Sequence, residues 1–172
     1  MKLPFIVIAL GAALLQVAVG SALSIHGIQP SFVLVAVYAY SITGGEARGI
    51  WNGALGGLIE DCLSGGVIGL MTSGYAIAGY IAGRAGKKVF NIGESANFGG
   101  IFIVSLVQGA YTAAILNAFK DSTEIFYMVL TFALPQALYN AVAGIFVLWL
   151  FKKQLARRVP WLRPLRPGRY RL

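Results

Sequence analysis

Two adjacent carboxylates, Glu60 and Asp61, are the residues of this sequence whose types and spacing could do chemistry. They precede Ser64-Gly65-Gly66, which predicts a tight turn. In a structural interpretation, Ser64 or the free backbone N–H groups of the next helix hydrogen-bond one carboxylate near a surface. In a functional interpretation, at least one carboxylate lies below the surface and faces an apolar interior or a partner, where an ionisable group is costly and usually functional. Such a pair could relay protons or cations.

The residue sets of enzymes and metal sites are missing from the rest of the sequence. His26 is the one histidine and Cys62 the one cysteine, whereas a structural metal site takes about four such ligands. The sequence has no phosphate-binding loop and no plausible serine, histidine and acid set. A single cysteine cannot form an internal disulfide, so we expect Cys62 to be a small buried hydrophobe. We therefore predict no catalytic residues, no metal, no cofactor and no enzymatic activity.

A row of glycines leads up to the two carboxylates. The glycines recur every three or four residues and so share one face of a helix, where the missing Cβ atoms let another helix approach closely. A similar row follows the turn. We expect the first of these helices to be central in the fold. The residues predicted to pack helices or bind a partner are Gly49, Gly53, Gly56, Gly57, Glu60, Asp61, Ser64, Gly69, Tyr75, Gly79, Tyr80 and Gly83.

Two later apolar segments carry polar side chains at helical spacing. The favoured interpretation is hydrogen bonding between helices, worth on average about 0.6 kcal/mol per bond in a membrane. A polar cavity for a small ligand is the alternative. Pro135 lies in the second segment and is expected to kink it. The polar and small residues concerned are Ser105, Gln108 and Thr112, and then Gln136, Asn140 and Gly144.

All these residues lie in a chain too apolar for an ordinary soluble domain. Of its 172 residues 58% are hydrophobic and 12% are charged, against about 25% charged residues in a soluble domain. A membrane-crossing helix needs about 20 apolar residues. We predict an all-α integral membrane protein, a bundle of six transmembrane helices in which the second and third are short. The predicted segments are 4–23, 31–43, 49–63, 67–83, 97–119 and 125–151.

The distribution of charge predicts the orientation of these segments. If all six cross and the N-terminus is cytoplasmic, every lysine and arginine except Lys120 lies on the cytoplasmic side, as the positive-inside rule requires. Both termini are then cytoplasmic, and a cleaved signal peptide would break the pattern. The net charge of +8 belongs to the membrane-flanking ends, so we expect no nucleic acid partner.

Residues 152–172 form a predicted cytoplasmic tail that follows the transmembrane domain of residues 1–151. The tail has eight basic residues, no acidic residue and three prolines, which prevent one regular helix. We interpret it as an anchor on anionic headgroups, each basic residue contributing about 1 kcal/mol. Docking onto a cytoplasmic partner is the alternative. The residues expected at the membrane surface are Lys152, Lys153, Arg157 and Arg158.

Residues 29–84 carry a pattern that resembles a known family. The pattern is Gln29-Pro30-Ser31, then Gly53-x-x-Gly56-Gly57-x-x-x-Asp61-x-x-Ser64-Gly65-Gly66-x-x-Gly69, then Gly79-Tyr80-x-x-Gly83-Arg84. It resembles the bacterial rod-shape-determining protein MreD family, and the resemblance extends over essentially the whole chain in length, number of segments and basic end. Members usually have an acidic residue where Ser31 stands, which weakens any role assigned to that position.

The resemblance implies a non-enzymatic scaffold of the elongasome, the cell-elongation machinery that controls cell shape and peptidoglycan synthesis in the bacterial inner membrane. The implied partners are MreC directly, and MreB, RodA and penicillin-binding protein 2 indirectly. Membrane lipids and a second copy of the chain are further candidates. The resemblance also implies a fold similar to the substrate-binding subunits of energy-coupling-factor transporters. Such a subunit is the alternative function, although the outer loops are short for closing over a ligand.

Overall fold

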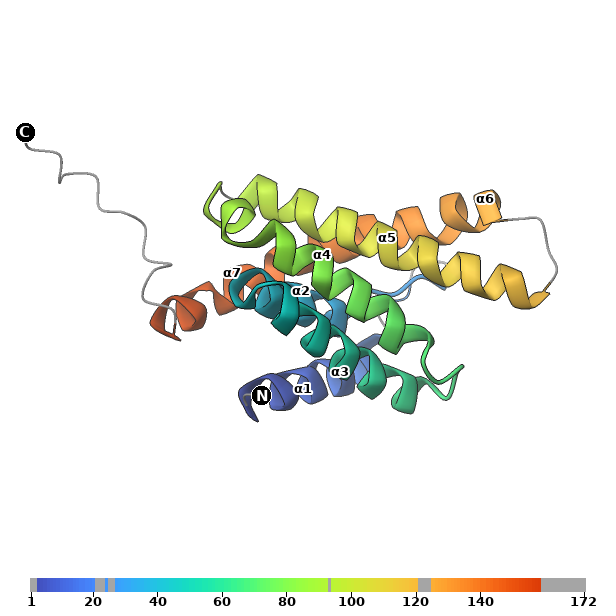
Figure 1. The fold of residues 1–172 in the computed structure, drawn as a ribbon, viewed down its shortest axis with the longest axis horizontal. Helices are drawn as coiled ribbons and strands as arrows, with labels where there is room; N and C mark the ends of the chain where they lie inside the picture. The colour runs from blue at the N-terminus through green and yellow to red at the C-terminus, as the bar shows by residue number, and fades with distance from the viewer. Residues whose placement is uncertain (1–2, 21–23, 25–26, 93, 121–124, 159–172) are drawn as a thin grey trace, which may run out of the picture.

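The computed structural model describes residues 3–158, except for residues 21–23, 25–26, 93 and 121–124. Every element in these ranges is a helix, which confirms the prediction of an all-α protein (Figure 1). The elements are α1 (Leu3–Gly20), α2 (Phe32–Gly44), α3 (Glu46–Ser64), α4 (Leu70–Ile92), α5 (Glu94–Lys120), α6 (Ile125–Met128), the π-helical turn η1 (Val129–Ala133) and α7 (Leu134–Arg158).

The helices lie where the hydropathy pattern places the six segments, with α6, η1 and α7 following one another as the last of them. Within the described ranges, 95–118 and 125–149 are long and apolar enough to cross a membrane. Phe5–Gly20 and Phe32–Gly44 are shorter apolar helices. The helix α4 continues beyond the predicted end at residue 83, through a kink at Gly86, whose φ is +54°.

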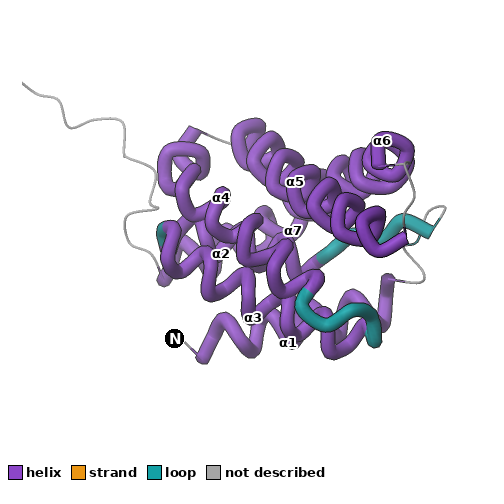
Figure 2. Tube along the Cα trace, turned by 45° about the vertical axis from the view of Figure 1, so that its right-hand side comes forward, coloured by secondary structure: helices purple, strands orange, loops and turns teal. Residues whose placement is uncertain are grey.

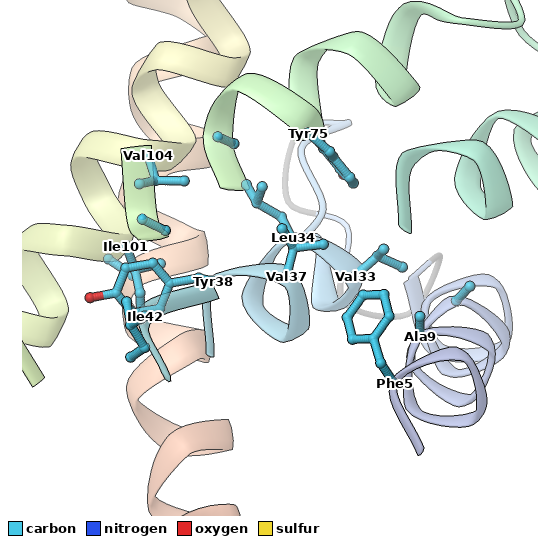
Figure 3. Packing of buried hydrophobic residues seen from close by; sticks show 14 residues of the cluster. Phe5, Ala9, Val33, Leu34, Val37, Tyr38, Ile42, Tyr75, Ile101 and Val104 are labelled. Carbon is cyan, nitrogen blue, oxygen red and sulfur yellow. The ribbon is translucent and has the colours of Figure 1, made fainter. Parts of the chain in front are cut away.

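The centre of the bundle is α2, and not α3 as the glycine row predicted. It contacts α1, α3, α4, α5 and α7, and nine of its 13 residues are buried. Ser41 is the only polar residue among these nine, and a helix that is apolar all round is stable where neighbours cover every side. Figure 3 shows Val33, Val37, Tyr38 and Ile42 of this helix within the core.

Two antiparallel pairs flank the central helix. One pair consists of α3 and α4, and the other of α5 and α7, as Figures 1 and 2 show from two directions. A turn with a left-handed Gly65 (φ +64°) and a Gly69 at φ +99° joins α3 to α4, which confirms the turn predicted there. The start of α1, the α2–α3 junction and the end of α7 lie at one end of the bundle, and the α3–α4 turn lies at the other (Figure 1).

Pro135 is associated with a π-helical turn. The Leu134 N–H donates to the carbonyl of Val129, five residues earlier, so one extra residue is accommodated before the proline. Proline has no N–H and its ring clashes with the carbonyl four residues before it, which explains why the regular helix is interrupted here. The helix α5 comes close at this point, because a Cβ on Gly109 would lie 2.7 Å from the Cβ of Ala133.

The sequence interpretation needs correction at Cys62 and at the start of the predicted tail, and some of its residues are not described by the structure. The prediction that Cys62 is buried is wrong: it is exposed, because Asp61 beside it turns inward and successive side chains on a helix point about 100° apart. The helix α7 continues through Lys152, Lys153, Arg157 and Arg158. His26 and the remainder of the predicted tail lie outside the described residues.

Candidate functional site

The glycine face of α3 packs directly on the backbone of α4. A Cβ on Gly49, Gly53 or Gly57 would overlap, in that order, the carbonyl oxygens of Gly79, Tyr75 and Met71. At the end of the same interface, a Cβ on Gly83 would lie 2.6 Å from the carbonyl oxygen of Gly45. The interhelical distance is therefore set by backbone contact, and this face of α3 has no room for the helix of a partner.

The remaining members of the predicted set have separate positions. Gly56 faces α2, where a Cβ would lie 2.8 Å from a methyl group of Val37. Tyr80 accepts an exposed hydrogen bond from Arg84, one turn further along α4, at 3.0 Å. Ser64 donates to the backbone carbonyl of Asp61 at 3.4 Å. None of these three contacts brings a residue next to Glu60.

Asp61 caps the start of α4. Its carboxylate accepts from the backbone N–H groups of Gly69, Met71 and Thr72 at 2.8, 3.0 and 3.0 Å, and from the Thr72 hydroxyl at 2.7 Å. Asp61 is 2% exposed. The free N–H groups at a helix start favour a negative charge. Asp61 thus has the role that the structural interpretation gave to one carboxylate: it accepts hydrogen bonds from the free N–H groups at the start of the next helix.

Glu60 points instead into the bundle. One carboxylate oxygen accepts from the Gln16 amide at 2.9 Å, and the other accepts from the Tyr75 hydroxyl at 2.7 Å. The Tyr75 hydroxyl also lies 2.7 Å from the hydroxyl of Ser31. Figure 3 shows Tyr75 directed from α4 towards the region where α2 begins. The two adjacent carboxylates therefore bind different groups and do not form a pair that could relay protons together.

The hydrogen bonds continue from Ser31 to the other pair of helices. The Ser31 side chain caps α2 by accepting from the Leu34 N–H at 3.2 Å, while its own N–H donates to Asn140 at 2.7 Å. The Asn140 amide in turn donates to Ser105 at 3.3 Å. We call the set Gln16, Glu60, Tyr75, Ser31, Asn140 and Ser105 the polar chain. It connects α1, α3, α4, the start of α2, α7 and α5.

Replacing Asn140 by alanine is expected to destabilise the bundle by about 1–3 kcal/mol. The substitution leaves the buried N–H of Ser31 without an acceptor, and an unsatisfied buried group costs about that much. Ser105→Ala is the matched control, because it removes only the 3.3 Å bond and should cost about 0.6 kcal/mol. Thermal unfolding in detergent measures both. Equal losses in the two variants would contradict the importance of the Ser31 to Asn140 bond.

A cavity of about 270 Å³ lies beside the polar chain, between α3, α4, α5 and the π-helical turn. Glu60 and Tyr75 line it on one side, and Gln108, Thr112 and Gln136 add further polar groups. The later polar residues therefore fall into two groups. Asn140 and Ser105 bond between helices, whereas the polar residues just named on α5 and α7 line the cavity.

Comparison with known proteins decides the family. The family model of the rod shape-determining protein MreD matches residues 1–159. The chain belongs to the MreD family. Membership gives the chain a role in rod shape determination and places it among membrane proteins. No curated protein and no solved structure is significantly similar to the chain.

Sequence reasoning missed Gln16 and Ser31 as members of the polar chain, whereas Asn140 and Ser105 were predicted to form hydrogen bonds between helices. Ser31 carried a signal, because a serine after Pro30 and before an apolar run is typical of a helix N-cap. Gln16 and Asn140 are polar residues within apolar segments, which usually face a bundle interior. Their partners lie 44 and 109 residues away in the sequence, so only the fold identifies them.

Proposed function

We propose that the chain is a non-enzymatic scaffold of the cell-elongation machinery in the bacterial inner membrane. It binds MreC directly, and through MreC it connects MreB, RodA and penicillin-binding protein 2 to peptidoglycan synthesis. The observation that carries this proposal is the MreD family match over residues 1–159. The absence of a catalytic set from the sequence, and the use of Asp61 as a helix cap, agree with a role in assembly.

The outer surfaces of the bundle support binding within a membrane. One face of α7 exposes a row of large apolar side chains at helical spacing, and α1 exposes another. Such rows are suited to lipid or to the transmembrane helix of a single-span partner. The rows are Leu134, Leu138, Val142, Phe146 and Trp149 on α7, and Val7, Leu10, Leu14 and Val17 on α1.

The proposed topology has six membrane-crossing helices with both termini in the cytoplasm, in an arrangement similar to the substrate-binding subunits of energy-coupling-factor transporters. The end of the bundle where α1 and α3 begin and α7 ends also holds Glu46, the first residue of α3, and Arg84, which lies 3.8 Å from it. The side chains of Arg84 and Glu46 are 68% and 50% exposed. Basic residues at this end agree with the positive-inside rule. Two of these six helices, over 95–118 and 125–149, are long and apolar enough to cross a membrane.

Co-purification tests the scaffold proposal. The full chain, tagged at its C-terminus, is solubilised from native membranes, and the retained proteins are identified by mass spectrometry. We expect MreC to be enriched at least about tenfold over an unrelated multi-pass protein with the same tag, which corresponds to about 1.4 kcal/mol of specific association. Recovery of an ATPase-coupled transmembrane subunit without MreC would instead indicate a transporter subunit. Recovery of neither would contradict the proposal.

A further inference from the structure

The cavity beside the polar chain has hydrogen-bonding groups that the described residues leave unused. The Gln136 amide makes no hydrogen bond within the described part of the chain. Gln108 donates through its nitrogen to Thr112 at 3.0 Å and to the Met71 sulfur at 3.5 Å, which leaves its amide oxygen open. Each carboxylate oxygen of Glu60 accepts one hydrogen bond and can accept another.

These open groups are mostly acceptors, and one of them is ionisable. Among the described residues Glu60 makes no ion pair, since its partners Tyr75 and Gln16 are neutral. An ionised carboxylate in apolar surroundings is stable only with hydrogen bonds and a counter-charge. A group with a positive charge and several N–H donors therefore complements this side of the cavity, and a primary ammonium has three such donors.

The rest of the lining of this cavity is largely apolar. Leu116, Met128 and Phe132 belong to it, and the side chain of Phe132 is 52% exposed, so the apolar wall reaches the outer surface of the bundle. The volume of about 270 Å³ is close to the lower limit of small-molecule pockets, about 300 Å³. The space suits a polar headgroup and the first part of an attached chain, with the rest of the chain outside.

We propose that this cavity binds the primary ammonium group of an amphiphile. The ammonium donates to Glu60 and to the amide oxygens of Gln108 and Gln136, while the apolar part follows Leu116 and Phe132 to the surface. The π-helical turn contributes Phe132 directly and precedes Gln136 by three residues, and such turns are frequent at functional sites. This binding adds a ligand to the protein and does not depend on MreC.

A competition between two lipids tests the proposal. The purified full chain in a nonionic detergent is incubated with equal amounts of phosphatidylethanolamine and phosphatidylcholine that have identical acyl chains, and native mass spectrometry measures which lipid is retained. Both headgroups are zwitterionic, but the trimethylated ammonium has no N–H donor. We expect about a tenfold preference for phosphatidylethanolamine in the wild type, because charge-assisted hydrogen bonds are the strong ones.

Three variants make this test specific. Glu60→Gln should abolish the preference without unfolding the bundle, because Gln16 has an unpartnered oxygen that can accept from the new amide. Gln136→Leu should reduce the preference because it removes another acceptor of the ammonium. It should not disturb the fold, since this side chain makes no hydrogen bond within the described chain. Glu46→Gln changes an exposed carboxylate at the other end of the bundle, and it should keep the full preference.

A competition with a water-soluble amine distinguishes whether the bound ammonium belongs to a membrane lipid or to a soluble molecule. Displacement of phosphatidylethanolamine by glycerophosphoethanolamine would support the site and indicate that a soluble amine can occupy it. Retention of the lipid against this competitor would support a membrane lipid as the ligand. Equal retention of the two lipids by the wild type, or a preference that survives in both Glu60→Gln and Gln136→Leu, would overturn the proposal.

Discussion

Replacing Gly53 by alanine is expected to lower the free energy of unfolding by about 3 kcal/mol or more, at the upper end of the cost of overpacking. The added Cβ would overlap the carbonyl oxygen of Tyr75 and lie 2.9 Å from the Cα of Ala76. These are backbone atoms, which cannot rotate away as a side chain can, so α3 and α4 must separate. Separation also moves Tyr75 away from Glu60 and disrupts the polar chain.

The fraction of monodisperse protein that survives heating in detergent measures this effect. We expect the midpoint to fall by on the order of 10 °C for Gly53→Ala. Gly99→Ala is the matched control, because Gly99 also lies within a helix but a Cβ there has no neighbour within 4 Å. Alanine is a better helix former than glycine by about 1 kcal/mol, so this control should keep or raise the midpoint. Similar midpoints for the two variants would show that α3 and α4 tolerate separation.

The helices themselves were predictable from the sequence, because each apolar segment is bounded by polar or glycine-rich residues. The turn at Gly65 was predictable for the same reason, but Gly69 was predicted to pack helices on the glycine row of the next helix and instead lies in the turn before α4, where a Cβ would have no neighbour within 4 Å. Which helix lies at the buried centre of the bundle was not predicted correctly. The short segment that became α2 is apolar on every side, which favours the centre of a bundle, yet the glycine row drew attention to α3.

The partner of the glycine row could not be read from the sequence. Glycines at this spacing indicate close approach of a helix, and the pattern is the same whether that helix belongs to the same chain or to another protein. The structure shows that α4 fills this face, through the backbone at Tyr75 and Gly79. A variant at Gly53 therefore reports on folding first, and partner binding is better tested on the exposed rows of α1 and α7.

The candidate site was predictable only in part. Glu60 was identified because an ionisable residue in an apolar segment is rare, but its hydrogen bonds to Gln16 and Tyr75 depend on how three helices meet. The π-helical turn before Pro135 contributes Phe132 and Ala133 to the lining of the cavity. Pro135 predicted an interruption of the regular helix here, but the sequence did not show that a π-helical turn would form or that its residues would line a cavity.

Replacing Asp61 by alanine is expected to destabilise the bundle by about 2–4 kcal/mol. The change leaves three backbone N–H groups and the Thr72 hydroxyl without their acceptor at the start of α4. Loss of a helix cap costs about 0.5–2 kcal/mol, and unsatisfied buried groups add to this cost. Because the carboxylate also joins the end of α3 to the start of α4, we expect the α3–α4 turn to open in the variant.

Asp61→Asn and Thr72→Val separate the contributions to this cap. One carboxylate oxygen accepts from Gly69, from the Thr72 N–H and from the Thr72 hydroxyl, and an asparagine oxygen in its place can keep all three. We therefore expect Asp61→Asn to cost about 1 kcal/mol, and Thr72→Val, which removes only the hydroxyl bond, to cost no more than that. Proteolysis at the α3–α4 turn and thermal unfolding in detergent measure these effects. If Asp61→Asn were as damaging as Asp61→Ala, the negative charge rather than the set of hydrogen bonds would hold α3 and α4 together.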